Sequence, residues 1–397
     1  MSDTSAATLA YLEQNGVHAN VRRAVAMVLR ERPADPIKAI SDHLLARARA
    51  KALLIVAHNF QREGAQLVAA CTARLLNAEI CAPVDGPLRE DLERDGIPTL
   101  VVSVDDIVSL ASERLLLVHT AMLWELVSKL VDREARFGWC IHESDLPVLF
   151  AQLTGFEDAL RSDHLLDRAP CVFVCDAQLR EYAPMRSPAA TSPFKRIYNG
   201  IDITAFDALC APVVRADVRA ELGVTTDQVL CVTVGTPKPR KGQLGVVHAA
   251  TELGWCCAVV GARGEGEYEA TLQAQSSCKL IGRGDAALVA KFMVAADVYV
   301  CNSEIESFPL GILEAMACSL PVVSTDCGGI REQLSTACGI LVPMEASTRL
   351  ENLVSALRPL ADAEVRRGMG SAARSRVEEL FGLATMRQAY EEFMGSL

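Results

Sequence analysis

The chain has 397 residues, half of them apolar, so it can bury a large core and is too long for one ordinary domain. Its net charge of −11 argues against a nucleic acid or an anionic membrane as the partner of the whole chain, although a local basic patch remains compatible with it. The 14 cysteines include no C-x-x-C pair, which favours small buried thiols over zinc ligands or disulfides.

The first residues, Met1 to Ser5, lack the basic and apolar segments of a secretory signal, and no apolar run approaches membrane-spanning length. We therefore expect a cytoplasmic protein. Residues 8 to 50 then have the pattern of two short amphipathic helices, in which Val17 and Val28 lie on one apolar face and Pro33 separates the two stretches. Two such helices cannot bury their apolar faces alone, so they need a partner.

The identities that characterise this segment are Tyr11-Leu12, Val17, Val28-Leu29, Arg32-Pro33, Asp35-Pro36-Ile37 and Leu44-Leu45. The series resembles the dimerisation and docking domain of the regulatory subunits of cyclic-AMP-dependent protein kinase, in which two helical hairpins form a four-helix bundle that docks an amphipathic helix of an anchoring protein. The resemblance implies a homodimer through residues 8–48, possible docking of such a helix, and tethering to a cytoplasmic assembly such as a cilium or flagellum. The alternative is a helical extension packed on the rest of the chain.

From Lys51 onward, apolar runs alternate with amphipathic segments, which is typical of βαβ units around a mostly parallel sheet. A helix is expected over 66–76, and the segment from Arg196 to Asp202 closes this first series. Residues 205 to 228, with a short helix from Arg215 to Leu222, are expected to link it to a second series. The expected strands are 53–57, one near Ile80, 100–102, 115–118, 138–141, 171–174, 229–234, 256–260, 279–281, 298–301, 321–324 and 339–342.

The stretch from Asp297 to Met316 predicts a buried strand, a loop and a helix. The first N–H groups of such a helix lack internal partners and the helix dipole is positive there, so a phosphate is favoured. Glu306 ends the loop and Glu314 lies about one turn into the helix, and carboxylates accept hydrogen bonds from hydroxyl groups. The ligand that suits this arrangement has phosphates between hydroxyl groups, as a nucleotide sugar does.

Glu306 and Glu314 are followed in order by Ala315-Met316-Ala317, Pro321-Val322-Val323 and Asp326 to Glu332. This series resembles the donor site of glycosyltransferase family 4, retaining enzymes of the GT-B fold that need no metal. The resemblance implies an α/β protein with two facing Rossmann-like domains and a cleft between them, in addition to the N-terminal helical hairpin. The implied divisions are 1–50 for the docking module, 51–207 for the acceptor domain, 208–378 for the nucleotide-sugar domain and 379–397 for a last helix that crosses back to the first domain.

The resemblance implies a reaction and the residues that perform it. A sugar would pass from a nucleotide-diphosphate sugar, most simply a UDP- or GDP-sugar, to the hydroxyl of an unknown acceptor. The implied catalytic residues are His142 and Glu306 at the transferred sugar and the cations Arg240 and Lys241 at the leaving diphosphate. The implied substrate-binding residues are Gly64, Gly235, Lys238, Arg283, Ser307, Phe308, Pro309, Leu310, Gly311 and Glu314.

Three positions depart from the family pattern: Thr236 stands where many members have arginine, Glu63 where another glycine is common, and Ser319 where a glycine often follows the helix. The first departure leaves open which of Lys238, Arg240 and Lys241 touches phosphate. The rival hypothesis is a catalytically silent glycosyltransferase-like scaffold or anchoring protein, and a third is a regulatory nucleotide or sugar-phosphate binder. A scaffold, however, has no physical need of the carboxylates, the cations and His142.

Overall fold

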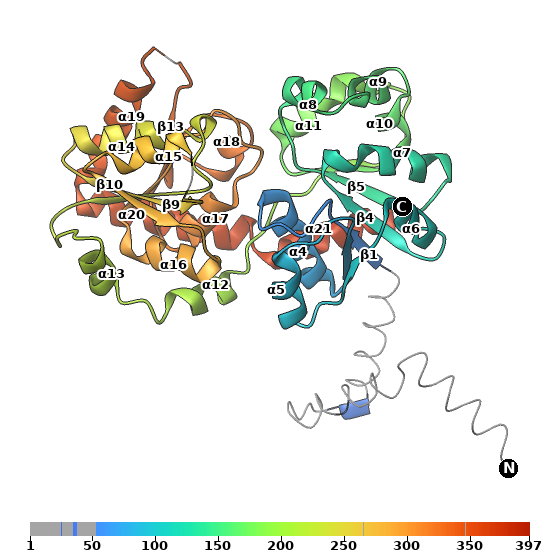
Figure 1. Ribbon diagram of the computed structural model, residues 1–397, viewed down its shortest axis with the longest axis horizontal. Coiled ribbons are helices and arrows are strands. Elements are labelled where there is room, and N and C mark those ends of the chain that lie inside the picture. Colours follow the sequence, from blue (N-terminus) through green and yellow to red (C-terminus); the bar gives the residue numbers. More distant parts are fainter. Residues whose placement is uncertain (1–24, 26–34, 38–52, 265, 346) are drawn as a thin grey trace. The chain divides into compact units, whose positions relative to one another are not determined.

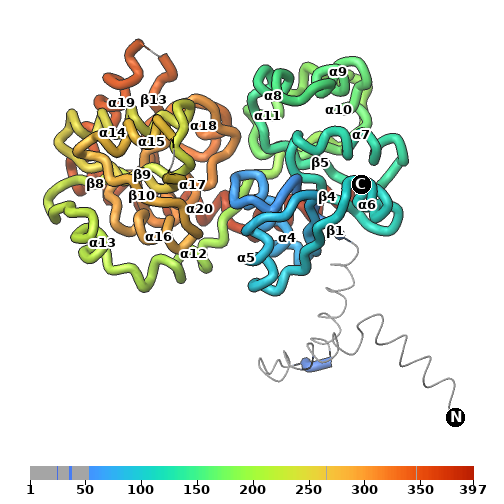
Figure 2. The backbone as a smooth tube through the Cα atoms, in the orientation of Figure 1, coloured from blue at the N-terminus to red at the C-terminus, as the bar shows by residue number. Residues whose placement is uncertain are grey.

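The computed structural model describes Val25, residues 35–37, 53–264, 266–345 and 347–397 (Figures 1 and 2). The docking module predicted over residues 8–48 lies outside the described residues, apart from these few positions, and stays a prediction. The described residues form two parallel β-sheets, of seven and six strands, with helices in the connections. Within the described ranges, no helix combines the length and the apolar character that crossing a membrane requires.

Contacts within the chain define two compact units. One ends at His119 and also includes Asp132–Phe137, and the other consists of Thr120–Val131 and Gly138–Leu397. The first unit contains strands in the order β3-β2-β1-β4, all parallel, with Ile55 of the fully buried β1 opposite both Ile80 and Leu117. Its elements are β1 (Leu53–Val56), α4 (Gly64–Leu76), β2 (Glu79–Ala82), α5 (Leu88–Arg94), β3 (Thr99–Val101), α6 (Val104–Leu110) and β4 (Leu115–His119).

The second unit begins with the remaining strands of the seven-stranded sheet. β5, β6 and β7 are parallel neighbours in that order, with Val172 opposite Cys140 on one side and Lys195 on the other. The elements here are η1 (Ala121–Leu123), α7 (Trp124–Asp132), β5 (Phe137–Ile141), α8 (Leu146–Gln152), α9 (Phe156–Arg161), α10 (Leu165–Arg168), β6 (Cys171–Phe173), α11 (Asp176–Tyr182), η2 (Ala183–Met185) and β7 (Phe194–Arg196).

The six-stranded sheet has the order β10-β9-β8-β11-β12-β13 and lies between two helical layers (Figure 1). Buried apolar side chains fill both faces of this sheet, as a parallel sheet requires. Its strands are β8 (Leu230–Val234), β9 (Cys256–Ala262), β10 (Cys278–Gly282), β11 (Val298–Cys301), β12 (Val322–Thr325) and β13 (Gly339–Val342). Its helices are α12 (Ile203–Cys210), α13 (Arg215–Glu221), η3 (Pro239–Lys241), α14 (Gln243–Glu252), α15 (Glu267–Gln273), α16 (Ala286–Ala295), α17 (Leu310–Ala317), α18 (Ile330–Gln333), α19 (Arg349–Leu357), η4 (Arg358–Ala361) and α20 (Ala363–Leu380). The last helix, α21 (Leu383–Gly395), contacts β5 of the seven-stranded sheet through Tyr390.

The predicted strands are present, and the fold class of two parallel-sheet Rossmann-like domains is confirmed. Two elements were not predicted: the strand β7, which precedes the segment from Arg196 to Asp202, and the helix α12, which begins at Ile203 and runs into the linker predicted over residues 205 to 228. The Asp202 carboxylate accepts a hydrogen bond from the Ala205 N–H at 2.9 Å and so caps this helix. α12 buries only Phe206, so its apolar pattern was too weak to reveal it. The predicted domain boundaries and the cleft between the domains stay predictions.

Candidate active site

The six-stranded sheet reverses its strand order at β8 and β11, and the loops after these two strands form the candidate site. β8 and β11 are parallel neighbours, with Val298 opposite Cys231. Their loops therefore leave the sheet at the same edge, which is where open α/β sheets bind ligands. Lys241 comes from the loop after β8 and Glu306 from the loop after β11, so two predicted residues from distant parts of the sequence meet here.

The turn that precedes α17 is fixed through its backbone. The Gly329 N–H donates a hydrogen bond to the Ser307 carbonyl at 2.8 Å, and the Gln333 side-chain amide donates to the Pro309 carbonyl at 3.0 Å. α17 begins at Leu310, where the first N–H groups have no acceptor within the helix. The turn therefore holds a helix N-terminus and its positive dipole in the site, an arrangement that stabilises an anion.

Phe308 turns its side chain away from the site. Its ring is buried, stacks on Tyr198 with the ring centroids 5.0 Å apart, and meets Phe381 edge-on. Its carbonyl accepts a hydrogen bond from the Asn199 side chain at 3.2 Å. Phe308, an implied substrate-binding residue, can therefore contribute its backbone N–H to a ligand but not its ring.

Two consecutive glycines after β12 permit close packing against the turn. Gly328 has a positive φ of 52°, and a Cβ atom there would lie 1.6 Å from the Glu306 carbonyl oxygen. A Cβ atom on Gly329 would lie 2.4 Å from the Ser307 carbonyl oxygen. Both distances are far below van der Waals contact, so larger residues would push the turn out of place. The Gly-Gly pair thus has a direct physical role in positioning Glu306.

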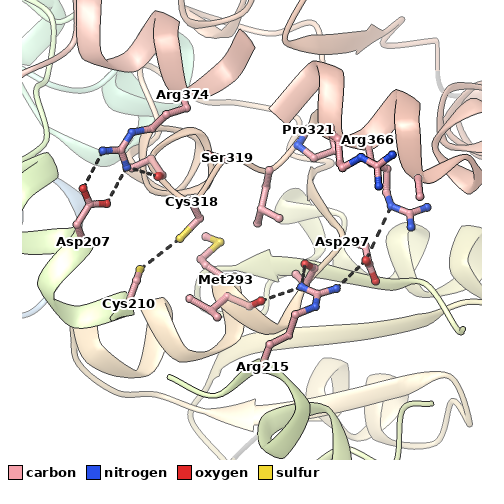
Figure 3. Close-up of a pocket in the computed structure, with 16 residues that line it drawn as sticks. Asp207, Cys210, Arg215, Met293, Asp297, Cys318, Ser319, Pro321, Arg366 and Arg374 are labelled. Carbon is pink, nitrogen blue, oxygen red and sulfur yellow. Dashed lines mark hydrogen bonds and ion pairs between the residues drawn. The ribbon is translucent and has the colours of Figure 1, made fainter. Parts of the chain in front are cut away.

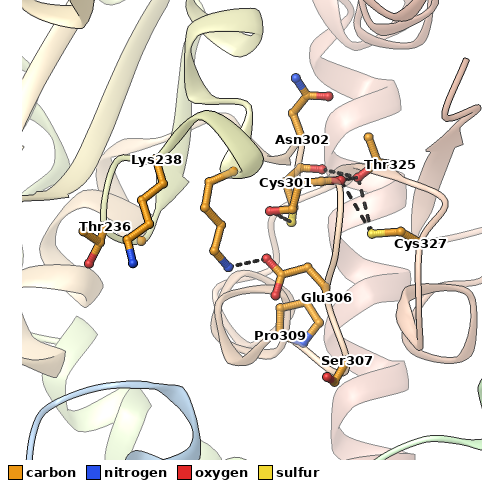
Figure 4. A network of polar contacts seen from close by, with 12 residues as sticks. Thr236, Lys238, Cys301, Asn302, Glu306, Ser307, Pro309, Thr325 and Cys327 are labelled. Carbon is orange, nitrogen blue, oxygen red and sulfur yellow. Dashed lines mark hydrogen bonds and ion pairs between the residues drawn. The ribbon is translucent and has the colours of Figure 1, made fainter. Parts of the chain in front are cut away.

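Lys241 and Glu306 form an ion pair with 2.5 Å between Nζ and Oε1 (Figure 4). The loop that carries Lys241 is fastened to the loop after β11, because the Arg240 carbonyl accepts from the Glu304 N–H at 2.8 Å. Arg240 and Lys238 are exposed, and neither side chain forms an ion pair among the described residues. Lys241 is therefore oriented by Glu306, while Lys238 and Arg240 present unpaired cations.

Glu314 is the fifth residue of α17 and its carboxylate is partly buried. Burial raises the pKa of Glu314 to about 7, because the surroundings disfavour the charged form. No hydrogen bond or ion pair involves this carboxylate within the described part of the chain. Its oxygen atoms are thus available to a hydroxyl-bearing ligand, and nearby Gly311 lies against the Tyr299 hydroxyl, which a Cβ atom would approach to 2.4 Å.

His142 follows β5 and its loop touches the turn before α17. The Ser307 hydroxyl donates to the His142 carbonyl at 2.5 Å, and the Ser144 hydroxyl donates to the Ser307 hydroxyl at 2.8 Å. Burial lowers the pKa of His142 to about 4, against an opposing effect of the Glu143 carboxylate, so its imidazole is neutral at pH 7. The structure therefore brings His142, Ser307 and the start of α17 together.

The other predicted residues are distributed as follows. Gly235 has a φ of 135°, which favours glycine at the end of β8. Arg283 is exposed after β10, and its N–H donates to the Ala262 carbonyl at 2.8 Å. The neighbouring Asp285 caps α16 by accepting from the Leu288 N–H at 3.1 Å. Gly64 opens α4 in the first compact unit.

Several residues that shape the site were not singled out from the sequence. Asn302 is buried directly after β11, and its side chain donates to the Gly242 carbonyl at 3.0 Å and accepts from Arg349 at 3.1 Å. A polar residue directly after a buried strand was the available signal for Asn302. Ser144 lies close to His142 in sequence, but its contact with Ser307 spans 163 positions and has no local signature.

Among the residues that the structure describes, no group of three or more His, Cys, Asp or Glu side chains could hold a metal ion. The groups that this site presents to a diphosphate are a basic loop and a helix N-terminus.

The structure resembles solved structures over most of its length. HepE of Anabaena, solved in complex with UDP, superimposes with a TM-score of 0.74 and 22% identity over 87% of this chain and 100% of that chain. WaaG, a glycosyltransferase of lipopolysaccharide biosynthesis, gives a TM-score of 0.60 with 17% identity over 86% of this chain and 100% of that chain. The chain has the GT-B fold.

The amino-acid sequence also matches known sequences over the second half of the chain. Residues 214–376 match the family model described as glycosyl transferases group 1. The alpha-maltose-1-phosphate synthase of Mycobacterium tuberculosis is 32% identical over 47% of this chain and 53% of its own length. A GDP-mannose-dependent mannosyltransferase that acts on a monoacylated phosphatidylinositol monomannoside in Corynebacterium glutamicum is 28% identical over 47% of this chain and 51% of its own length. The chain thus spans about half the length of the curated relatives it matches.

Proposed function

We propose that this protein is a retaining glycosyltransferase of family 4 that transfers a sugar from a nucleotide-diphosphate sugar to an acceptor hydroxyl. The observation that carries the proposal is the convergence of Lys241, Glu306 and the N-terminus of α17 at one edge of the six-stranded sheet, with Glu314 one turn further along the helix. This arrangement combines cationic groups for phosphate with carboxylates for hydroxyl groups.

The proposed donor is a UDP- or GDP-sugar. HepE binds UDP, and another of its structures contains UDP-glucose, whereas the Corynebacterium relative is named for GDP-mannose. The exposed loop at Arg283 is the proposed seat of the base. This loop lies after β10, and the Asp285 carboxylate is not proposed to contact the base because it already caps α16.

In the proposed reaction the bond between the anomeric carbon and the diphosphate oxygen breaks, and a bond from that carbon to the acceptor oxygen forms on the same face. The acceptor proton passes to a phosphate oxygen. Lys241, together with Lys238 or Arg240, would stabilise the negative charge that develops on the diphosphate. These cations and the helix N-terminus take the part of a divalent cation, so we propose that turnover needs no metal.

The neutral imidazole of His142 suits a hydrogen bond to a hydroxyl group of the transferred sugar, because a neutral ring both donates and accepts. Glu306 would lie at the same sugar, and the bound diphosphate would compete with it for Lys241. Binding of donor is therefore expected to redistribute the Lys241 ammonium between the carboxylate and the phosphate.

A thermal-shift panel of UDP-, GDP- and ADP-sugars tests the proposal, followed by donor hydrolysis assays on any sugar nucleotide that raises the Tm. One nucleotide class should stabilise the protein, because a ligand that binds only the folded state raises its stability. Glu314→Ala should abolish the shift, whereas Glu351→Ala, an exposed carboxylate on α19, should preserve it. No shift with any donor would favour the alternative of a catalytically silent scaffold or anchoring protein.

We also propose that the chain forms a homodimer through residues 8–48 and that this segment can dock an amphipathic helix of another protein. The support is the sequence resemblance alone. Sedimentation of the full chain and of a chain limited to residues 51–397 tests it, because the full chain should have twice the monomer mass and the shortened chain should be monomeric. Equal association states would reject the dimer.

A further inference from the structure

An open pocket of about 510 Å³ lies between α12, α16, α17 and α20, and it contains none of the predicted donor-site residues (Figure 3). Its arginines already have partners. Arg215 pairs with Asp297 at 2.7 Å, and Arg374 pairs with Asp207 at 2.7 Å. An anion is therefore not the evident ligand of this pocket, and its distinctive chemistry lies in its two cysteines.

Cys210 and Cys318 both line the pocket, and their sulfur atoms are in contact at 3.5 Å (Figure 3). Cys210 is the last residue of α12, and Cys318 is the C-terminal cap of α17. Both are only partly buried, so a small reagent that enters the pocket can reach them. A disulfide has its sulfur atoms about 2 Å apart, so joining these two requires a small movement of side chains.

The surrounding contacts hold the two thiols in this position. The Arg374 guanidinium bridges the two helices by donating to both oxygens of Asp207 on α12, each at 2.7 Å, and to the Ala317 carbonyl on α17 at 2.6 Å. α20, which carries Arg374, packs directly against the chain after α17, where a Cβ atom on Gly370 would lie 1.9 Å from the Ser319 carbonyl oxygen. The ends of α12 and α17 are thus fixed side by side independently of the cysteines.

We propose that Cys210 and Cys318 form a reversible intramolecular disulfide when the protein meets a hydroperoxide. With hydrogen peroxide, the thiolate of one cysteine attacks an oxygen atom, the O–O bond breaks, and water leaves as that cysteine becomes a sulfenic acid. The second sulfur then attacks the first, the S–S bond forms, the S–O bond breaks and a second water leaves. Two thiols are oxidised and one peroxide is reduced to two waters.

In this proposal Cys210 attacks first, because its pKa is raised less than that of Cys318. Burial raises the pKa of both thiols. At Cys210 the hydrogen bond with Cys318 lowers the pKa, the Asp207 carboxylate raises it and the Arg374 guanidinium lowers it, whereas at Cys318 the neighbouring Cys210 adds to the effect of burial. The thiolate fraction is small at neutral pH for both, so the reaction is slow and accelerates as pH rises. In a reducing compartment the pair is reduced, and it becomes a disulfide only under sustained oxidation.

The disulfide would close a loop between residues 108 positions apart and join α12 to α17. α17 carries Gly311 and Glu314, so the modification fastens the C-terminal end of the helix whose N-terminus enters the donor site. Closing a long loop restricts the unfolded chain, so the oxidised protein should unfold at a higher temperature than the reduced protein. The proposal concerns the thiols and stands whether or not the chain transfers a sugar.

The test exposes the full-length protein to hydrogen peroxide at mildly alkaline pH, blocks the remaining thiols with an alkylating reagent, and maps the tryptic peptides by mass spectrometry. The wild type should lose two alkylatable thiols, yield a peptide in which Cys210 and Cys318 are linked, and recover both thiols with dithiothreitol. Its Tm should rise on oxidation and return on reduction.

Cys210→Ser and Cys318→Ser should each abolish the linked peptide and the rise in Tm. Cys278→Ser, a change at another partly buried cysteine, should leave both intact. Each serine variant is compared with its own reduced form, so a loss of stability from the substitution itself does not obscure the result. The proposal would be overturned by continued alkylation of both thiols after oxidation, by a sulfinic acid on Cys210 without the link, or by a link from either cysteine to a third.

Discussion

Ser319 adopts a backbone conformation that suits glycine. It follows the cap of α17 with a φ of 57°, in the left-handed region that commonly ends helices. Ser319→Gly should raise the free energy of unfolding by up to about 1 kcal/mol, because relief of the strain exceeds the added entropy of the unfolded chain. Urea denaturation measures the change. Ser371→Gly, in the interior of α20, should instead lower stability by roughly 0.5 to 1 kcal/mol.

Glu314 makes stability depend on pH in an unusual direction. Its pKa is about 7 in the folded protein and near its ordinary value of 4.5 in the unfolded chain, so the folded state binds more protons between these pH values. Stability therefore falls as pH rises from about 4.5 to 7 and is then constant, by an amount on the order of 3 kcal/mol. Glu314→Gln should remove this component. The free energy of unfolding of the variant minus that of the wild type should therefore be larger at pH 8 than at pH 5.

Urea denaturation of both proteins at pH 5 and pH 8 checks this expectation. Glu351→Gln serves as the control, since this exposed carboxylate on α19 should not alter the pH profile. Parallel profiles for the wild type and Glu314→Gln would show that the carboxylate is ionised in the folded protein at neutral pH. Sugar nucleotide binding should shift the profile as well, because hydroxyl groups that donate to the carboxylate favour its charged form.

At the scale of elements, α20 contains two glycines with opposite expected responses to alanine. A Cβ atom on Gly370 would lie 1.9 Å from the Ser319 carbonyl oxygen, whereas a Cβ atom on Gly368 would meet nothing within 4 Å. Gly370→Ala should therefore destabilise the protein by about 1 to 3 kcal/mol, because backbone must move to admit the methyl group. Gly368→Ala should stabilise it by roughly 0.5 to 1 kcal/mol. Thermal unfolding of the two variants measures these changes. Similar changes in Tm for Gly370→Ala and Gly368→Ala would contradict the packing of α20 on α17.

The elements themselves were largely predictable, because parallel strands are buried on both faces and stand out as apolar runs. β8 and β11 were found in this way, and the residues at their carboxyl ends followed from the general position of ligand sites in such sheets. α12 was missed because it buries a single side chain. α12 has only eight residues, and it is stabilised by its cap and by the contact of Asp207 with Arg374, which joins residues far apart in the sequence.

The site could be predicted only where its residues lie close together in the sequence. Glu306 and Glu314 lie on one short segment, so their relation to a helix N-terminus is visible in the sequence. The ion pair of Lys241 with Glu306 and the contact of Ser144 with Ser307 depend on loops that meet only in the folded chain. The sequence left open which of Lys238, Arg240 and Lys241 touches phosphate. The structure shows that Lys241 pairs with Glu306, and the residue that contacts phosphate stays a prediction.

At the scale of the whole molecule, the second unit combines strands of the seven-stranded sheet with the complete six-stranded sheet. Polar contacts between these two parts include the hydrogen bonds of Ser307 with the loop after β5 and of Asn199 with Phe308. α21 follows the six-stranded sheet, and its Tyr390 hydroxyl lies 3.8 Å from the Cys140 sulfur of β5. Contacts of this kind determine whether the two parts unfold together.

Glu332 connects the two parts through a single side chain. Its carboxylate, on α18, accepts hydrogen bonds from the Asp176 and Ala177 N–H groups at the start of α11, both at 2.8 Å. Glu332→Ala would leave two helix N-terminal donors without this partner and remove a charge that favours the helix dipole, at a cost of about 1 to 3 kcal/mol. Hydrogen exchange should accelerate in α11 and remain unchanged in β8. Arg331→Ala, which removes only an exposed ion pair with Asp326, should leave exchange in α11 unaltered, and equal acceleration by both changes would contradict a specific role for Glu332.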